Sequence, residues 1–348
     1  IGIGKLLDEL VDDHEAPRCG KKRGYLRRGD ESGVHFPAMD IPTFDDVLGA
    51  ADRISPFVHR TPVLSSATLD SELAATVYFK CENLQKVGAF KARGATNAVM
   101  GLSDEDASAG VATHSSGNHG QAVAFAAAAR GIPAWVVMPD HAPSVKVDAV
   151  RGYGAEVVFC KQAERESRTR ELVAQTGATL VHPFDNSAVI AGQGTAALEF
   201  LSEVSDLDVI VTPVGGGGLL SGTSLVARTL RPMARVVGGE PEAVDDAFRS
   251  IRDGKLHPAV AAPDTLADGL LTGLGERNFA LLNGNVDIVT VTEDEIVAAA
   301  RFFVERMKIV VEPSGAVSLA AVRKMNVSGA RVGAIVSGGN TDFRWLES

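Results

Sequence analysis

Cysteine is scarce in this sequence, and no apolar run is long enough to span a membrane. The three cysteines, Cys19, Cys81 and Cys160, are odd in number and widely spaced, which fits neither a disulfide framework nor a zinc-ligand cluster. The N-terminus also lacks the apolar core of a secretion signal. A chain of 348 residues can bury a full hydrophobic core without covalent links. These absences predict a soluble protein of the reducing cytoplasm.

An excess of positive charge is missing as well. The formal net charge is -10 at pH 7, which disfavours nucleic acids and anionic membranes as the main partner. One local exception, RCGKKRGYLRR at residues 18–28, carries six positive charges. We expect residues 1–38 to form a mobile N-terminal extension without a function of its own, with a regulatory or nucleic-acid-binding arm as the alternative.

From about residue 76, short β-branched runs alternate with alanine-rich helical runs. The runs that predict strands are residues 76–80, 110–115, 134–139, 155–160, 179–184, 208–214, 234–240, 287–292 and 331–337. Several are continuously apolar, which is typical of parallel strands covered on both faces. The stretch GQAVAFAAAARG predicts a helix that ends at Gly131. The pattern predicts an α/β fold with largely parallel sheets and right-handed crossovers.

Loops that follow strands are the first places to search for a site, because ligands of such folds bind beyond the carboxyl ends of the strands. Gly215, Gly216, Gly217 and Gly218 lie between a buried strand and a helix that starts near Leu219. Backbone N–H groups there can converge on a phosphate at the positive end of the helix. The spacing matches neither a P-loop nor a dinucleotide-binding fingerprint. A plain flexible loop is the alternative.

Two more polar loops follow predicted strands. One offers hydroxyl, amide and backbone donors at a helix N-terminus, from Ser115, Ser116, Gly117, Asn118 and His119. These groups suit a carboxylate, although an ordinary serine cap explains much of the pattern. The other loop begins at Ser337 and continues through Gly338, Gly339 and Asn340.

Lys91 lies in the apolar stretch VGAFKARGA. A lone lysine in such a stretch usually extends its ammonium group to water. In a partly desolvated pocket its pKa falls instead, and the free amine can form a Schiff base with an aldehyde. An aldehyde cofactor that carries a phosphate would need both this lysine and the glycine loop, and pyridoxal phosphate is such a cofactor.

Six blocks of the sequence resemble, in order, the fold-type II pyridoxal phosphate enzymes of the serine racemase and serine/threonine dehydratase family. They are ENLQKVGAFKARGA, SSGNHGQA, AGQGTAALE, VGGGGLLSG, EPSGA and SGGN, and the resemblance runs from about Phe44 to Phe343. It implies a two-domain α/β fold with a larger and a smaller open twisted, parallel-rich sheet, flanked by helices, and the cofactor in the cleft between them. Residues 39–109 and 188–348 would form the large cofactor-binding domain and residues 110–187 the small domain. The resemblance also implies a homodimer.

The resemblance further implies a role for each residue of the cofactor site. Lys91 would form the Schiff base and remove the Cα proton, while Phe90 would pack on the cofactor ring. Asn118 would hydrogen-bond the 3-hydroxyl of the ring, and Ser337 would face the pyridine nitrogen. The phosphate would be held by Gly215, Gly216, Gly217 and Gly218 with the N–H of Leu219. A hydroxyl group facing the ring nitrogen does not hold it protonated, which suits α,β-elimination better than transamination.

The implied reaction is the deamination of L-threonine or L-serine to 2-oxobutanoate or pyruvate and ammonia. The substrate carboxylate would bind the loop from Ser115 to His119. Ser116 leaves two alternatives open. In serine racemases this serine is the acid/base on the face opposite the lysine, and racemisation needs a proton carrier on each face. The serine also occurs in threo-3-hydroxyaspartate dehydratases, whereas dehydratases without racemase activity usually have alanine there.

The segment ADGLLTGLG, residues 267–275, is expected to border the substrate side chain through Asp268 and Thr272. Arg168 matches a position that can approach the substrate in racemases. Leu271 stands where many bacterial relatives have an arginine, which weakens a dicarboxylic substrate. The few residues after Asn340 leave no room for the regulatory domain of isoleucine-inhibited threonine deaminases. A β-replacement enzyme and a non-catalytic pyridoxal phosphate-binding homologue are further alternatives.

A divalent cation is also implied by the resemblance. The stretch GGEPEAVDDAF would place Glu240, Asp246 and the carbonyl group of Val244 on Mg²⁺, Mn²⁺ or Ca²⁺. Oxygen ligands suit such hard cations. The alternative is a solvated acidic start of a helix. The role of the ion would be structural or activating.

Overall fold

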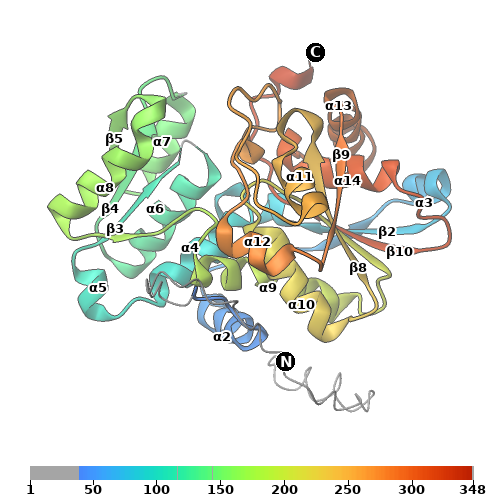
Figure 1. The fold of residues 1–348 in the computed structure, drawn as a ribbon, viewed down its shortest axis with the longest axis horizontal. Coiled ribbons are helices and arrows are strands. Elements are labelled where there is room, and N and C mark those ends of the chain that lie inside the picture. The colour runs from blue at the N-terminus through green and yellow to red at the C-terminus, as the bar shows by residue number, and fades with distance from the viewer. Residues whose placement is uncertain (1–38, 116, 143, 347–348) are drawn as a thin grey trace, which may run out of the picture. The chain divides into compact units, whose positions relative to one another are not determined.

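The computed structural model describes residues 39–115, 117–142 and 144–346 (Figure 1). Residues Asp40–Ser348 form one compact unit. The predicted N-terminal extension, residues 1–38, lies outside the described residues, and its role stays a prediction. Among the described residues, no helix is both long and apolar enough to cross a membrane.

The strands of the described residues form two sheets. The six-stranded sheet has the order β1-β2-β10-β7-β8-β9, and the four-stranded sheet has the order β5-β4-β3-β6. β1 pairs with β2 antiparallel, and the other pairings are parallel. The strands are β1 (Val63–Ser65), β2 (Thr76–Cys81), β3 (Val111–His114), β4 (Ala134–Pro139), β5 (Glu156–Cys160), β6 (Thr179–Leu180), β7 (Val209–Pro213), β8 (Arg235–Pro241), β9 (Asp287–Val291) and β10 (Arg331–Val336).

The predicted α/β fold is therefore confirmed, and each of the nine predicted runs contains a strand. Only β1 was not predicted, because a strand of three residues is too short to show an alternating pattern. The α-helices are α2 (Phe44–Ile54), α3 (Ala67–Leu73), α4 (Lys91–Met100), α5 (Asp104–Ser108), α6 (Asn118–Arg130), α7 (Ser144–Gly152), α8 (Arg165–Thr176), α9 (Ser187–Glu203), α10 (Gly218–Leu230), α11 (Asp246–Asp253), α12 (Glu276–Leu282), α13 (Glu293–Phe302) and α14 (Pro313–Lys324). α6 ends at Gly131 as predicted, with a φ of 73° that glycine adopts readily.

Helices cover both faces of the four-stranded sheet. Alternate residues of a strand point to opposite faces, so Val136 and Met138 of β4 pack with α6 and α7, whereas Val137 packs with Leu172 of α8. α4 packs in the same core as α6. Residues 111–180 supply the four strands of this sheet, but the boundaries of the two predicted domains stay a prediction.

The six-stranded sheet is also covered on both faces. α13 and α14 form the larger core cluster with the central strands, and Phe79 of β2 meets Phe303 edge to face. On the other face, Phe200 of α9 lies against Gly333 of β10, and Leu220 of α10 lies against Gly238 of β8. Because β3 and β6 are parallel, the loops that follow them leave from the same edge of the four-stranded sheet. The loops after β7 and β10 likewise leave from one edge of the six-stranded sheet.

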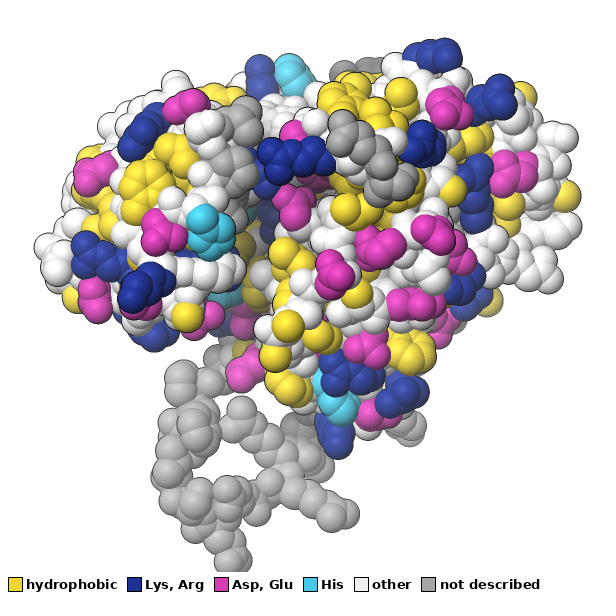
Figure 2. Space-filling model, turned by 90° about the horizontal axis from the view of Figure 1, so that it is seen from above, with side chains coloured by type: hydrophobic (Ala, Val, Ile, Leu, Met, Phe, Trp, Pro, Cys, Tyr) yellow, Lys and Arg dark blue, Asp and Glu magenta, His cyan; other side chains and the backbone are white. Residues whose placement is uncertain are grey.

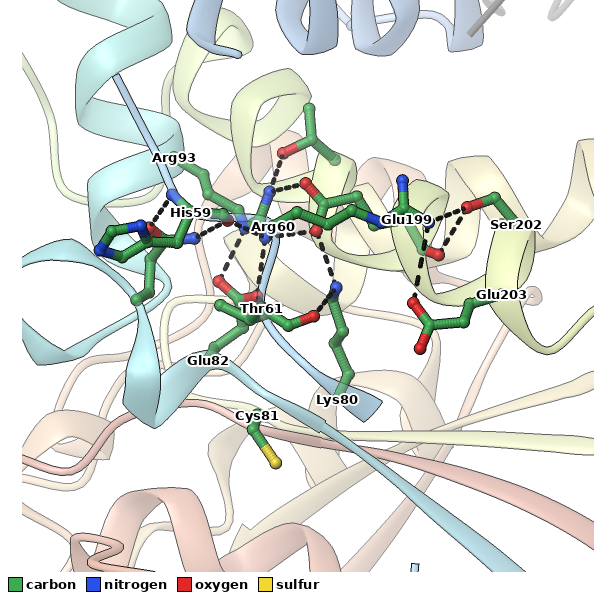
Figure 3. A network of polar contacts seen from close by, with 12 residues as sticks. His59, Arg60, Thr61, Lys80, Cys81, Glu82, Arg93, Glu199, Ser202 and Glu203 are labelled. Carbon is green, nitrogen blue, oxygen red and sulfur yellow. Dashed lines mark hydrogen bonds and ion pairs between the residues drawn. The ribbon is translucent and has the colours of Figure 1, made fainter. Parts of the chain in front are cut away.

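A buried network of charges joins α4 to the six-stranded sheet and to α9 (Figure 3). Arg93 of α4 is fully buried, and its guanidinium group donates two hydrogen bonds to Glu82 at 2.7 and 2.8 Å. It donates two more to Glu199 of α9, each at 2.8 Å. Lys80 of β2, also fully buried, donates to Glu199 at 2.7 Å and to the carbonyl oxygen of Thr61 at 2.8 Å.

The network contains two cations and two carboxylates, so its formal charges cancel. Burial alone would lower the pKa of Arg93, but Glu82 and Glu199 raise it, and the guanidinium group stays charged. A planar guanidinium group matches two carboxylates through paired hydrogen bonds, which lysine cannot do. Lys91 begins α4, two residues before Arg93. The network therefore ties the start of this helix to four other segments of the chain.

Replacing Arg93 with methionine would leave the fully buried Glu82 carboxylate and the Glu199 carboxylate, which is 20% exposed, with Lys80 as the one remaining cation of this network. We expect Arg93→Met to lower the free energy of unfolding by about 3–5 kcal/mol, because an uncompensated charge stays buried. Arg235→Met is the matched control, since Arg235 pairs with Asp287 and both side chains are more than half exposed, at 53% and 58%. It should cost less than about 1 kcal/mol. Urea unfolding monitored by circular dichroism measures both, and equal losses would contradict the role given to the buried network.

Candidate functional site

Lys91 is the first residue of α4, and its side chain is largely buried. Its Nζ donates a hydrogen bond to the carbonyl oxygen of Pro183 at 2.8 Å and lies 5.0 Å from the centre of the Phe90 ring. Burial lowers the pKa of Lys91 to about 8. Roughly a tenth of the amine is then unprotonated at pH 7, several hundred times more than in an ordinary lysine. The amine can therefore act as a nucleophile or a base.

Three histidines near Lys91 are neutral at pH 7. Burial lowers the pKa of His119 well below its ordinary value, and the positive charge of Lys91 lowers it further. Burial also lowers the pKa of His114, and it lowers that of His182 to about 4. The Nε2 atom of His119 lies 3.0 Å from the carbonyl oxygen of Val181 and so carries the ring proton. None of these three imidazoles adds a cation that would compete with the amine for an anionic ligand.

The glycine loop follows β7 and leads into α10 as predicted. Gly217 has a φ of 92°, and a Cβ there would lie 2.5 Å from a methyl group of Leu274, so both the backbone and the packing require glycine. Among the described residues, no group accepts a hydrogen bond from the backbone N–H groups of Gly215 to Leu219. These donors stand at the positive N-terminal end of α10.

Gln193 of α9 adds a buried amide beside this loop. The side chain is fully buried, and neither its Nε2 nor its Oε1 has a partner among the described residues. Its Oε1 would lie 2.4 Å from a Cβ on Gly218, which places the amide directly against the loop. An unpartnered buried amide is costly unless a ligand completes its hydrogen bonds. Together with the free N–H groups, it fits a phosphate.

The loops before Lys91 and after β10 run side by side. The N–H of Phe90 donates to the carbonyl oxygen of Ser337 at 3.0 Å, and Ala89 forms an antiparallel bridge with Gly338. The Ser337 side chain is buried, at 3% exposure. The structure thus brings together Phe90, Lys91 and Ser337, three of the predicted cofactor residues.

Asn118, the first residue of α6, joins this group. Its Oδ1 accepts a hydrogen bond from Asn340 at 2.9 Å, and its Nδ2 donates to Glu312 at 2.8 Å. Burial raises the pKa of Glu312 to about 8, and the negative charge of Asp268 adds to this, while the hydrogen bond from Asn118 opposes it. At pH 7 most of this carboxyl group is uncharged.

The predicted carboxylate-binding loop lies at the N-terminus of α6. The Ser115 hydroxyl accepts a hydrogen bond from the N–H of Gly117 at 3.1 Å, and Gly117 is the N-cap residue of the helix. Ser116 lies outside the described residues, so its role as a second acid/base stays a prediction.

The residues predicted to border the substrate side chain are arranged differently from one another. Asp268 pairs with Lys146 of α7, which joins the segment between α11 and α12 to a helix that packs on the four-stranded sheet. Thr272 is half-buried in the loop that follows Asp268, and Leu271 beside it is exposed. Arg168 of α8 pairs with Glu171 on the same helix, at 3.0 Å. Contact of these residues with a substrate stays a prediction.

The predicted cation site is built around the N-terminus of α11. Glu240 is buried and accepts hydrogen bonds from the N–H groups of Ala247 and Phe248 at 2.9 and 2.8 Å. Asp246, also buried, accepts one from Leu274 at 2.9 Å. Among the described residues, no three His, Cys, Asp or Glu side chains are grouped to hold a metal ion. The predicted set contains only two carboxylates and the carbonyl of Val244, and it stays a prediction.

Four groups of this site had no role predicted from the sequence: the Pro183 carbonyl, His182, Gln193 and Glu312. Gln193 and Glu312 lie in the blocks AGQGTAALE and EPSGA, where a polar residue among glycines or before a proline was the available signal. The Pro183 carbonyl had no signal, because a backbone group carries no side-chain chemistry.

Charge on the surface is mixed. Figure 2 shows Lys and Arg side chains interspersed with Asp and Glu side chains over the face in view. A nucleic-acid-binding face would instead gather Lys and Arg. The described residues of this face show no such patch.

Comparisons with known proteins show the family of the chain. The family described as pyridoxal-phosphate dependent enzyme matches residues 54–338. A serine racemase from Dictyostelium discoideum is 49% identical over 313 residues, which cover 88% of this chain and 97% of that protein. An L-threo-3-hydroxyaspartate ammonia-lyase from Saccharomyces cerevisiae is 48% identical over 312 residues, which cover 88% and 95%. The crystal structure of a T.th. threonine deaminase has a TM-score of 0.83 at 44% identity and covers 87% of this chain and 99% of that one. The chain therefore belongs to the family of pyridoxal-phosphate dependent enzymes.

Proposed function

We propose that the chain acts on small β-hydroxy amino acids, eliminating water from L-serine or L-threonine and releasing ammonia with pyruvate or 2-oxobutanoate. The observation that carries this proposal is the Lys91 amine, whose pKa is lowered to about 8 and which hydrogen-bonds Pro183, the residue before the Phe184 ring that lies against the glycine loop. The T.th. threonine deaminase, at 44% identity, supports elimination.

The residues that would hold pyridoxal phosphate are those predicted from the sequence, with Gln193 added by the structure. The loop from Gly215 to Leu219, with the Gln193 amide, would hold the phosphate; Phe90, Asn118 and Ser337 would surround the ring. When bound, the cofactor withdraws electrons from the Cα atom of an amino acid and so makes the Cα proton removable. Ser337 offers a hydroxyl group rather than a carboxylate, which favours elimination over transamination.

Lys91 would then move the Cα proton. A base must be partly unprotonated at the working pH, and burial gives the amine this property. The carbonyl group of Pro183, which accepts a hydrogen bond from Nζ, holds the amine in place. The neutral imidazoles of His119 and His182 add no positive charge that would lower its basicity further.

The substrate carboxylate would bind at the N-terminus of α6. The partial positive charge of the helix end and the Ser115 hydroxyl attract an anion there. Gly117, which leaves open space where a Cβ would be, allows a ligand to approach the backbone closely. This arrangement would fix the Cα atom relative to Lys91.

Serine racemisation is the second candidate, and Ser116 favours it. Inversion at Cα needs one proton carrier on each face, which Lys91 and Ser116 would supply. The 49% identity to the Dictyostelium discoideum serine racemase supports this candidate. Dehydration of threo-3-hydroxyaspartate is supported by the relative from Saccharomyces cerevisiae, although Leu271 offers no charge for a second carboxylate.

A panel of L-serine, L-threonine and L-threo-3-hydroxyaspartate tests these activities together. We expect oxoacid and ammonia from L-serine and L-threonine, and D-serine from L-serine. Ser116→Ala should reduce D-serine formation by about tenfold or more, because the second proton carrier is lost. The rate of oxoacid formation should fall by a smaller factor. The products are measured by chiral chromatography and an oxoacid assay. Absence of product from all three substrates would refute the proposed function.

Lys91→Ala is expected to abolish both activities and the visible absorbance band of the bound cofactor, since the Schiff base that gives this band would form on the Lys91 amine. Lys161→Ala is the matched control, because Lys161 is exposed and has no predicted role in the site. Its spectrum and activities should match those of the unchanged chain. A visible band that survives Lys91→Ala would contradict the role of Lys91.

We also propose that Glu240, Asp246 and the Val244 carbonyl bind a divalent cation. Two buried carboxylates near each other favour a cation, and carboxylate oxygens can accept both a backbone N–H and a metal ion. After treatment with EDTA, addition of Mg²⁺, Mn²⁺ or Ca²⁺ should raise the melting temperature. A ligand at one hundred times its dissociation constant adds about 2.7 kcal/mol to the free energy of unfolding. Asp246→Asn should remove this response. A melting temperature insensitive to all three ions would rule out the site.

The homodimer and the cytoplasmic location stay predictions.

A further inference from the structure

Glu312 is a buried acidic residue at the centre of the site. It is the N-cap residue of α14, its side chain is 3% exposed, and Pro313 follows it at the start of the helix. Its backbone N–H donates to the carbonyl oxygen of Gly338 at 3.1 Å. The residue is therefore fixed next to the loop that carries Ser337. Because its side chain is buried, contact with water does not account for an acidic residue there.

The side chain of Glu312 determines how Asn118 is oriented. Asn340 donates to the Oδ1 of Asn118 at 2.9 Å and to the carbonyl oxygen of Val87 at 2.7 Å, so the oxygen end of the Asn118 amide is fixed. The nitrogen end donates one hydrogen to Glu312 at 2.8 Å. An amide nitrogen carries two hydrogens, and the second stays available for a ligand in a fixed direction.

Gly338 packs directly against the carboxyl group. A Cβ at this position would lie 2.1 Å from the Oε1 of Glu312 and 3.2 Å from the Nδ2 of Asn118. No side chain could occupy this space without moving the carboxyl group. Glu312, Asn118 and Gly338 therefore form one packed unit between α6, α14 and the end of β10.

The charged groups that face Glu312 are Asp268, in the segment between α11 and α12, and Lys146 of α7, and these two form an ion pair. Their charges largely offset each other, so burial decides the protonation state. The pKa of about 8 means that the carboxyl group is mostly neutral at pH 7 and gains a negative charge above pH 8.

We propose that Glu312 is a positioning residue of the cofactor site that works as a neutral carboxylic acid. Its Oε1 holds the Asn118 amide in one orientation, from which the other hydrogen of Nδ2 would be offered to the phenolic oxygen of pyridoxal phosphate. The neutral form of Glu312 would keep a second negative charge away from that oxygen. The inference rests on the proposed cofactor site but not on the proposed substrates.

Glu312→Gln and Glu312→Ala separate the two parts of this role. Glutamine keeps an uncharged oxygen acceptor for Asn118, so its affinity for pyridoxal phosphate should stay within about threefold of the unchanged chain. Alanine removes the acceptor, and the affinity should fall about tenfold or more with a shifted visible band. Equilibrium dialysis and absorbance measure both, without any amino acid present.

The pH dependence of the visible band tests the neutral form. Between pH 7 and 9 the band of the unchanged holoenzyme should shift as Glu312 loses its proton, and the band of Glu312→Gln should not. A loss of cofactor affinity in Glu312→Gln as large as in Glu312→Ala would show that the charged carboxylate is required and would overturn the proposal. So would an identical pH response in the two proteins.

A double-mutant cycle with Asn118→Ala tests whether Glu312 acts through Asn118. Glu312→Ala should weaken cofactor binding no further once Asn118 is alanine, whereas additive losses would overturn the proposal. Melting of the cofactor-free variants checks folding. If Glu312→Ala does not fold, the cofactor affinity and the pH response of Glu312→Gln, each compared with the unchanged chain, decide. Because no readout uses a substrate, failure of the proposed reactions on serine or threonine would leave these results unchanged.

Discussion

The buried network around Arg93 is the interaction on which the site depends. It connects α4 to β2, to the short helix at Glu82 and to α9, and its charges are largely removed from water (Figure 3). Desolvation of these ions is costly, and only complete pairing offsets the cost. Such pairing tolerates little displacement of α4. A lysine two residues before Arg93 is consequently held at a fixed place and can be surrounded by loops from other parts of the chain.

Burial then adjusts the protonation states within the site. The same effect lowers the pKa of Lys91 and raises that of Glu312, because low polarity disfavours either charge. Three histidines are neutral for the same reason. Near neutral pH the pocket therefore offers a partly free amine and a neutral acid, and the N-termini of α6 and α10 supply the positive potential for anionic groups.

The loop after β6 connects the parts of the site. Pro183 accepts the hydrogen bond of Lys91, and the Phe184 ring lies against Gly216, since a Cβ there would be 2.1 Å from a ring atom. Asn278 of α12 donates to the carbonyl oxygens of both Phe184 and Gly216. One short segment from the smaller sheet thus contacts both the amine and the glycine loop.

The sequence by itself determined the alternation of strands and helices, the glycine loop between β7 and α10, and the choice of Lys91, because each is a local pattern of residue types. Gly217 is an example, because a residue without a side chain can adopt the positive φ that this loop requires. It could not show that Arg93 pairs with Glu199, or that Asn118 meets Glu312, 194 residues later. Those contacts, and the pKa values that follow from them, were decided only by the tertiary structure, because burial and pairing depend on which distant segments the sheets bring together.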